Sequence, residues 1–311
     1  MRATLPGTAG VVATTPVLLG TADDSSRVSA LGRRLSGVEV GECSTHRFPD
    51  GEVKVGIETP VVGREVAIVC SLDQPGDRIL PLLFLAATAR DLGAARVGLV
   101  APYLAYMRQD DRFHPGDGIT STYFAGLLSR AFDWLVTVDP HLHRWPSLDR
   151  IYTIPSRIVH AAPAIAAWIA DQVADPIIIG PDAESEQWVS AVASAAGAPS
   201  LVLQKVRHGD RDVEISAPDR SRCQGRNPVV VDDIISSGQT MAETVIQLRA
   251  AGLPAPVCIG IHAVFAPGAD DAIMRAGAGQ LVTCNTIIHE TNAIDIDELL
   301  ADAVGRMIGD R

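Results

Sequence analysis

The segment with the clearest chemical character lies at residues 229–240 and reads Val-Val-Val-Asp-Asp-Ile-Ile-Ser-Ser-Gly-Gln-Thr. A β-branched run leads into two carboxylates, and a loop of small residues then opens a helix. Gly238 allows a close backbone turn, and a helix N-terminus offers free N–H groups and the positive end of the helix dipole. Ser236, Ser237 and Thr240 add hydroxyl donors. The loop therefore predicts a cradle for a phosphate monoester.

Asp232 and Asp233 stand directly before this loop. Two carboxylates would repel a bound phosphate, so we expect them to bind the hydroxyls of a sugar, or a metal ion held by those hydroxyls. A helix cap rich in Asp and Ser is the simpler structural interpretation. Capping alone gives little reason for two successive carboxylates directly after a hydrophobic strand, so the sequence favours the sugar-phosphate interpretation.

The elements that must position these side chains alternate between short β-branched runs and Ala/Leu-rich helical segments. This alternation predicts an α/β protein whose mostly parallel sheets carry helices on both faces. It occurs twice, which predicts two related domains, residues 1–155 and residues 156–311, with a last helix able to pack back on the first domain. The predicted strands are residues 65–70, 97–101, 134–138, 176–180, 201–204, 228–232 and 256–263. The predicted helices are residues 79–92, 121–131, 160–173, 187–196 and 240–251.

Polar segments follow most of the predicted strands. In open α/β sheets, ligands bind outside the carboxyl ends of the strands. We therefore expect the functional side chains to come from the segments at those ends. These segments are residues 103–118, 139–144, 181–186, 205–212 and 232–240.

Composition narrows the class of protein. A formal net charge of −11 argues against a nucleic-acid binder, because phosphate backbones select for surplus Lys and Arg. Five scattered cysteines without Cys-x-x-Cys spacing indicate reduced thiols of a cytoplasmic protein rather than a disulfide framework or a zinc site. No stretch approaches the ~20 apolar residues that cross a bilayer, so no membrane partner is expected. The chain has neither a Walker P-loop nor a Rossmann glycine motif.

Several segments together resemble a known family. Residues 232–240 look like the phosphoribosyl-binding loop of the type I phosphoribosyltransferases. Three further segments are similar to motifs of one group among them, the ribose-phosphate pyrophosphokinases, or phosphoribosyl pyrophosphate synthetases. They read Arg-Phe-Pro-Asp-Gly-Glu at 47–52, Tyr-Leu-Ala-Tyr-Met-Arg-Gln-Asp at 103–110 and Asp-Pro-His at 139–141. The resemblance implies a phosphoribosyltransferase-like fold and a cytoplasmic homo-oligomer. It also implies transfer of pyrophosphate from magnesium-bound ATP to the 1-hydroxyl of ribose 5-phosphate.

The same resemblance assigns side chains to the reaction. Lys205 and Arg207 match a Lys-x-Arg pair on a mobile catalytic loop, where cations stabilise the charge that develops on the transferred group. His141 and Asp182 match the metal positions, and Mg²⁺ is compatible with such a sparse, hydrated site. The implied ATP site comprises Phe48, Asp50, Gly51, Glu52, Arg108 and Gln109. The implied ribose 5-phosphate site comprises Arg207, Asp232, Asp233, Ser236, Ser237, Gly238, Gln239 and Thr240.

Each of these assignments has a structural alternative. Residues 48–52 also fit an Asp-Gly hairpin turn, and residues 108–110 fit a solvated polar loop. His141 fits an ordinary loop histidine, and a zinc site with His143 would lack further ligands at zinc-like spacing. A lysine and an arginine in a polar loop are commonly exposed to solvent.

The sequence also departs from the family pattern. Gln239 replaces a glycine that admits close backbone approach, and Glu184 adds negative charge beside the expected pyrophosphate site. Two other functions therefore stay open. A nucleobase phosphoribosyltransferase would share the phosphate loop but leaves the second α/β domain unexplained. A non-catalytic regulatory homologue would not need Lys205 and His141.

Overall fold

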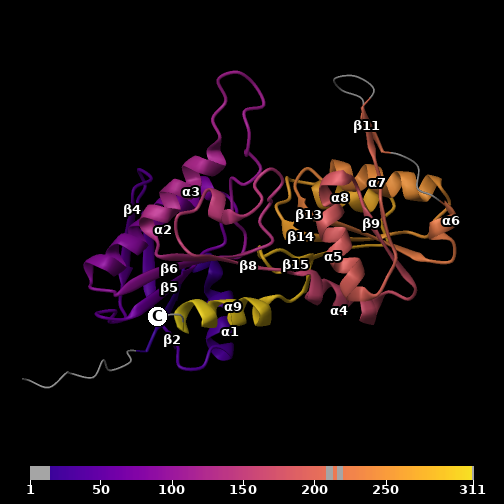
Figure 1. The fold of residues 1–311 in the computed structure, drawn as a ribbon. Helices are drawn as coiled ribbons and strands as arrows, with labels where there is room; N and C mark the ends of the chain where they lie inside the picture. The colour runs from indigo at the N-terminus through magenta and orange to yellow at the C-terminus, as the bar shows by residue number, and fades with distance from the viewer. Residues whose placement is uncertain (1–14, 208–212, 216–219, 310–311) are drawn as a thin grey trace, which may run out of the picture.

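The computed structural model describes residues 15–207, 213–215 and 220–309. Within them the chain forms two six-stranded sheets, and every strand pair in both sheets is parallel. The sheets lie side by side in two lobes, with helices on both faces of each (Figure 1). The predicted α/β architecture with two parallel sheets is confirmed.

The first sheet has the strand order β2-β1-β5-β6-β7-β8. Its strands are β1 (Val17–Gly20), β2 (Glu39–Val40), β5 (Glu65–Val69), β6 (Arg96–Ala101), β7 (Trp134–Val138) and β8 (Ser156–Val159). The helices of this lobe are α1 (Ser25–Arg34), α2 (Pro75–Asp91), α3 (Thr120–Ala131) and the 3-10 turns η1 (Ala22–Asp24) and η2 (Leu148–Arg150).

The second sheet has the strand order β10-β9-β13-β14-β15-β16. Its strands are β9 (Pro176–Gly180), β10 (Ser200–Val202), β13 (Asn227–Ile235), β14 (Val257–Ala263), β15 (Gln280–Cys284) and β16 (Asn292–Ile294). Its helices are α4 (Ala162–Gln172), η3 (Ala183–Ser185), α5 (Glu186–Ala196), α6 (Arg220–Cys223), α7 (Gln239–Ala250) and α8 (Ala269–Arg275). The last helix of the chain is α9 (Asp297–Gly309).

The two lobes share one topology. In each sheet the second strand along the chain lies at the edge, followed by the first, third, fourth, fifth and sixth. In each, an antiparallel hairpin is inserted between the second and third strands. These hairpins are β3 (Cys43–Arg47) with β4 (Val53–Ile57), and β11 (Lys205–Arg207) with β12 (Val213–Ile215).

Successive side chains along a strand are buried on opposite faces of its sheet. In β1, Leu18 belongs to the same buried cluster as Val28 and Leu31 of α1. Its neighbours Val17 and Leu19 belong to the cluster on the other face, under α2 and α3. Successive strand residues point to opposite faces, so a fully apolar strand must be covered twice.

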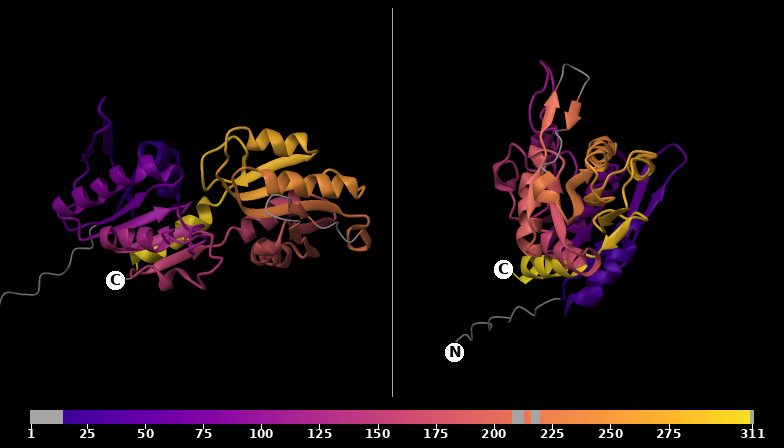
Figure 2. Two further views of the ribbon diagram at one scale, coloured as in Figure 1. Left: turned by 90° about the horizontal axis from the view of Figure 1, so that it is seen from above. Right: turned by 90° about the vertical axis from the view of Figure 1, so that its right-hand side faces the viewer.

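The C-terminal helix joins the two lobes. Helix α9 runs from the second lobe back to the first, where it packs against α1, β7 and β8 (Figures 1 and 2). An ion pair between Arg27 Nη1 and Asp297 Oδ1, 2.6 Å apart, ties α9 to α1, and both side chains are buried. The expected division at residues 155/156 falls just before β8. That strand is still paired with β7 in the first sheet.

Two sequence features have simple structural counterparts. The five cysteines are free thiols. Among the helices of the described ranges, none is long and apolar enough to cross a membrane.

Candidate active site

The phosphate-loop strand is longer than the sequence indicated. The sequence predicts that this strand, β13, ends at Asp232, but it continues to Ile235 because its pairing with β14 extends from Val229 to Ile235. Asp232 lies opposite Gly260, and Ile235 lies opposite Ala263. Asp232 and Asp233 are therefore strand residues, and their side chains point to opposite faces of the sheet.

The turn after β13 is built around Gly238. Its φ of +73° lies in the left-handed region, and a Cβ at this position would meet the carbonyl oxygen of Ala269 at 2.8 Å. The carbonyl of Ser236 accepts a hydrogen bond from the backbone N–H of Ala266 at 2.9 Å. The loop between β14 and α8 thus supports the phosphate loop from behind, and only glycine fits at this close approach.

The N-terminus of α7 opens directly after this turn. The first N–H groups of a helix have no acceptor within the helix, so they remain available to an anion. The departure at Gln239 leaves this end open, because its side-chain amide donates to Glu243 Oε1 at 2.9 Å, one turn further along α7. Gln239 therefore points along the helix.

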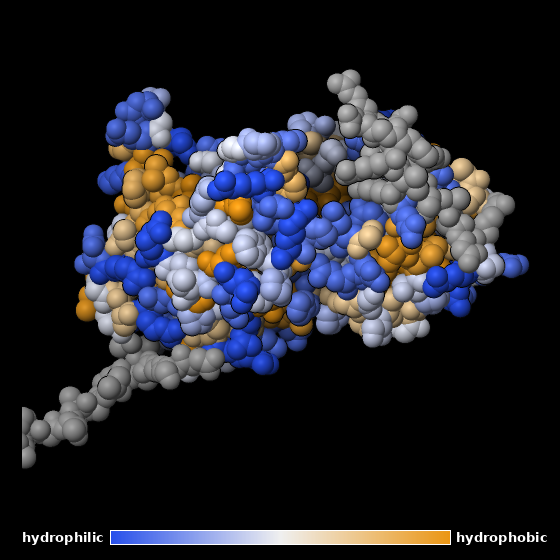
Figure 3. Space-filling view, turned by 45° about the horizontal axis from the view of Figure 1, so that its top comes forward, coloured by the Kyte–Doolittle hydropathy of each residue, from blue (hydrophilic) through white to orange (hydrophobic). Residues whose placement is uncertain are grey.

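A pocket of about 220 Å³ covers this loop. Its wall consists of Arg108, Asp232, Ile234, Ile235 and residues 236–241. Arg108 comes from the first lobe, in the segment between β6 and α3, and its side chain is exposed. A sugar phosphate in this pocket would meet one cation from the opposite lobe, backbone N–H groups and the Asp232 carboxylate. Hydrophilic residues also dominate the surface between the two lobes (Figure 3).

Asp233 faces away from this pocket and binds the predicted metal ligand His141. Its Oδ2 lies 2.6 Å from His141 Nδ1, with both side chains mostly buried. Burial alone would lower the pKa of the His141 imidazole, but the hydrogen bond and charge of Asp233 outweigh it and hold that pKa above its ordinary value. The ring also stacks on Trp188 of α5, with centroids 6.2 Å apart. The orientation of His141 is therefore fixed by the other lobe.

Asp182, the second predicted metal ligand, lies at the carboxyl end of β9. Its carboxylate accepts the backbone N–H of Glu184 at 3.0 Å and so caps the 3-10 turn η3. Glu184 itself is exposed, and its Oε1 lies 3.6 Å from Nε2 of His143. The loops that carry Asp182 and His141 therefore touch across the interface between the lobes.

Asp139 holds the end of β7 in an unusual conformation. It is buried and has a φ of +28°, a strained value for a residue with a side chain. Its carboxylate accepts from the backbone N–H of Ala161 at 2.7 Å and lies 2.8 Å from His160 Nδ1. Its carbonyl accepts from the buried His262 Nε2 of the second lobe at 3.2 Å. This network fixes the backbone two residues before His141.

The predicted nucleotide residues divide between two places. Gln109, next to Arg108, accepts the backbone N–H of Ser121 with its carbonyl at 3.2 Å. Residues 48–52 form the tip of the β3–β4 hairpin, where Gly51 has a φ of +93° and Phe48 is 41% exposed. Among the described wall residues of the Arg108 pocket, none comes from this hairpin tip. The structure therefore shows the Asp-Gly hairpin turn but does not bring it into the pocket.

Lys205 and Arg207 form strand β11, paired with β12. The structure describes their backbone only, so the predicted contacts of their side chains lie outside the described part. The hairpin follows β10, so its backbone leaves the second sheet at the carboxyl edge, the edge at which the phosphate loop lies.

Sequence reasoning missed the contacts that cross between the lobes. The pairing of Asp233 with His141 joins residues 92 positions apart, and no local pattern predicts it. One signal was present: the predicted strand 256–263 is long enough to pair with residues beyond Asp232. Extending β13 accordingly would have placed the two carboxylates on opposite faces.

Family models support the division into two parts. A model described as the N-terminal domain of ribose phosphate pyrophosphokinase matches residues 23–131, and one described as a phosphoribosyl transferase domain matches residues 147–298. With the phosphate loop at the carboxyl edge of the second sheet, these matches define a two-domain protein of the phosphoribosyltransferase type.

Relatives extend over nearly the whole chain. A ribose-phosphate pyrophosphokinase of Halobacterium salinarum is 31% identical over 290 residues, covering 93% of this chain and 100% of the relative. The ribose-phosphate pyrophosphokinase of Saccharolobus solfataricus is 33% identical over 256 residues, covering 80% and 86%. The chain belongs to the ribose-phosphate pyrophosphokinase family. The crystal structure of phosphoribosylpyrophosphate synthetase from Mycobacterium smegmatis has the same fold, with a TM-score of 0.81, 21% identity and coverage of 95% of this chain and 99% of that one.

Replacing Gly238 by alanine should destabilise the protein more than the same change at Gly225. Both glycines have a φ of +73°, so each alanine costs roughly 1–2 kcal/mol of backbone strain. Only at Gly238 does the added Cβ meet another backbone atom, since nothing lies within 4 Å at Gly225. Chemical denaturation of Gly238→Ala and Gly225→Ala measures the difference in free energy of unfolding. Equal losses would mean that Ala269 does not press on the loop.

Proposed function

We propose that this chain transfers the terminal pyrophosphate of magnesium-bound ATP to the 1-hydroxyl of ribose 5-phosphate, giving phosphoribosyl pyrophosphate and AMP. The observation that carries the proposal is the pocket in which Arg108 of the first lobe faces the phosphate loop of the second. Membership of the ribose-phosphate pyrophosphokinase family supports it.

Ribose 5-phosphate occupies the phosphate loop in this proposal. Its phosphate accepts hydrogen bonds from the N-terminus of α7 and from the hydroxyls of Ser236, Ser237 and Thr240. Asp232, on the pocket side of β13, accepts from the ribose hydroxyls. Asp233 is assigned differently from the sequence-based prediction, because its carboxylate is already bonded to His141 on the other face.

Mg²⁺ fits the chemistry of the His141 region. A histidine whose Nδ1 is bonded to a carboxylate has its Nε2 oriented as a metal ligand, which is the usual arrangement around protein-bound metals. Asp182, at the neighbouring strand end, supplies a carboxylate oxygen. When bound, Mg²⁺ neutralises charge on the transferred pyrophosphate. Asp233 then acts as the positioning residue for His141.

The protein's part in the transfer is orientation and charge. The 1-hydroxyl oxygen attacks the β-phosphorus of ATP, and the bond from that phosphorus to the oxygen bridging to the α-phosphorus breaks. AMP leaves, and the hydroxyl proton passes to solvent. Arg108 offers a bidentate guanidinium fork to phosphate. Lys205 and Arg207, on the hairpin at the edge of the site, stabilise charge on the transferred group. No residue is assigned as a general base.

The nucleotide site and the assembly are part of the same proposal. The exposed Phe48 ring stacks on the purine, and Asp50, Gly51, Glu52 and Gln109 complete the ATP contacts. We also propose a cytoplasmic homo-oligomer. Exposed apolar side chains on α2 and α3 support an interface between copies: Leu80 is 50%, Phe84 42% and Tyr123 59% exposed.

Purified protein supplied with ribose 5-phosphate, ATP and Mg²⁺ should form AMP and phosphoribosyl pyrophosphate in equal amounts. Mass spectrometry detects both products. Free ribose should not replace ribose 5-phosphate, because the loop is built for a phosphate. ADP as the product would indicate an ordinary kinase. Pyrophosphate release from phosphoribosyl pyrophosphate and a nucleobase would indicate a phosphoribosyltransferase, and no turnover would favour the non-catalytic homologue.

The two adjacent aspartates should have separable roles. Asp233→Asn weakens the orientation of His141 and should raise the free Mg²⁺ concentration for half-maximal rate about 10-fold or more. Asp232→Asn should mainly raise the KM for ribose 5-phosphate. Steady-state kinetics with Mg²⁺ and ribose 5-phosphate varied independently measures both. If both variants change only the KM for ribose 5-phosphate, Asp233 does not act through His141 and the two aspartates share one role.

Lys205→Ala should lower kcat on the order of 10²–10³-fold while changing the KM for ribose 5-phosphate little, since its charge is needed during transfer. Lys205→Arg should recover part of the rate. The only other lysine, Lys54, lies in the nucleotide hairpin, so the control is the exposed Arg306→Ala on α9. If Lys205→Ala has a kcat near that of the unmodified protein, Lys205 does not stabilise charge during the transfer.

A further inference from the structure

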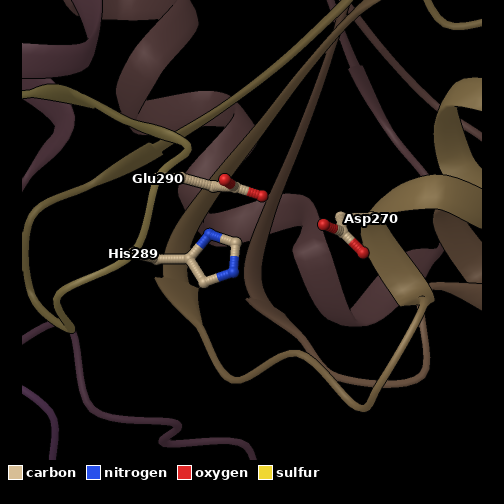
Figure 4. A group of neighbouring side chains, drawn as sticks. All are labelled: Asp270, His289 and Glu290. Atoms are coloured by element: carbon tan, nitrogen blue, oxygen red, sulfur yellow. The ribbon is translucent and has the colours of Figure 1, made fainter.

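Three possible metal ligands converge behind the phosphate loop. Asp270 belongs to the first turn of α8, while His289 and Glu290 lie in the loop between β15 and β16. One ligand atom from each lies within 4.8 Å of the others. Figure 4 shows the imidazole and the two carboxylates directed toward a shared space. This cluster comes from elements other than those that carry His141 and Asp182.

The His289 ring is held in place by residues outside the cluster. Its Nδ1 lies 2.9 Å from Thr291 Oγ1, and that hydroxyl is 2.8 Å from Thr283 Oγ1. Phe265 packs against the ring, with centroids 4.7 Å apart. Metal-bound histidines are commonly fixed by donating the N–H of the nitrogen that does not bind the metal, whereas Nδ1 of His289 also accepts the backbone N–H of Thr291 at 3.3 Å. A cation at Nε2 therefore requires the ring proton to move to Nδ1, where Thr291 Oγ1 can accept it in place of the longer backbone contact.

Within the ranges that the structure describes, no lysine or arginine pairs with either carboxylate. Among the described residues, no ion pair or side-chain hydrogen bond engages Asp270 or Glu290, and His289 has no carboxylate oxygen within 4.0 Å. Two carboxylates this close repel each other, and a divalent cation between them removes the repulsion. The cluster therefore has the charge and the donors of a cation site.

We propose that Asp270, His289 and Glu290 bind a divalent cation of the zinc class, with water completing the coordination. One imidazole and two carboxylates suit such borderline cations, whereas Mg²⁺ and Ca²⁺ favour oxygen ligands throughout. Ligand atoms around tetrahedral Zn²⁺ lie about 3.4 Å apart, so the side chains close by roughly 1 Å on binding. Glu290 is exposed and free to make that movement.

The position of the site gives it a structural role. Asp270 follows Ala269, whose carbonyl lies against Gly238, and Ala266 of the same loop donates to Ser236. A cation that joins Asp270 to the β15–β16 loop would stabilise residues 266–269, which contact the phosphate loop. The bound ion is thus predicted to stabilise the fold and to lower the KM for ribose 5-phosphate.

Equilibrium dialysis of the full chain against micromolar Zn²⁺ in excess Mg²⁺, followed by elemental analysis, tests the site without substrates. His289→Gln and Asp270→Asn should each weaken one Zn²⁺ site at least about 10-fold and abolish its thermal stabilisation. The matched control Asp271→Asn changes the next carboxylate of α8, which pairs with Arg275, and should bind like the unmodified protein. His141→Ala should retain this site.

Two results would overturn the proposal. One is unchanged zinc binding in both His289→Gln and Asp270→Asn, and the other is zinc lost only in His141→Ala. Asp270→Asn preserves side-chain shape, and unfolding measured without zinc shows whether either variant is folded. Because no substrate is present, failure of this test leaves the proposed transferase reaction standing.

Discussion

The hydrogen bond between His141 and Asp233 is the constraint on which the site depends. His141 lies in the loop that follows β7 of the first sheet, and Asp233 lies within β13 of the second. Their 2.6 Å separation therefore requires the carboxyl ends of both sheets to meet. Further hydrogen bonds around this pair also join the two lobes. Asp139 and His262 fix the backbone leading to His141 from both lobes, and Ser71 Oγ donates across the junction to the carbonyl of Thr286 at 2.7 Å. A partly buried ionic contact of this kind tolerates little displacement, because either group left without the other would be costly.

The same junction explains why Arg108 can reach a pocket built by the other lobe. A loop of the first sheet faces a loop of the second because both leave their sheets on the same side (Figure 1). In a single α/β domain, ligands bind at the carboxyl edge of one sheet. Here two such edges are opposed, so a nucleotide and a sugar phosphate can be held from two sides. That arrangement suits a transfer between two anionic substrates in a protein with a net charge of −11.

Local patterns predicted the phosphate loop well but not its long-range partners. Gly238 and the hydroxyl residues around it follow from turn and helix-cap chemistry, which operates within a few residues. The orientation of Asp233 depends on the register of β13 against β14, which is a property of the sheet and not of the segment. The predicted helix 79–92 starts later than α2, which begins at Pro75, a residue type favoured in the first turn of a helix. The strand alternation fixed the fold class because fully buried parallel strands are apolar throughout.

The return of α9 to the first lobe has a consequence for how the chain is made. Leu300 and Val304 lie in one buried cluster with Leu18, Val28 and Leu31, so part of the first core consists of residues near the end of the chain. During synthesis the first sheet emerges long before α9, and the part of its apolar face that α1 does not cover stays open until α9 follows. The second lobe has all of its strands before α9 and can close first. The core of the N-terminal lobe is then completed only after the strands of the second lobe have emerged, when α9 packs onto α1.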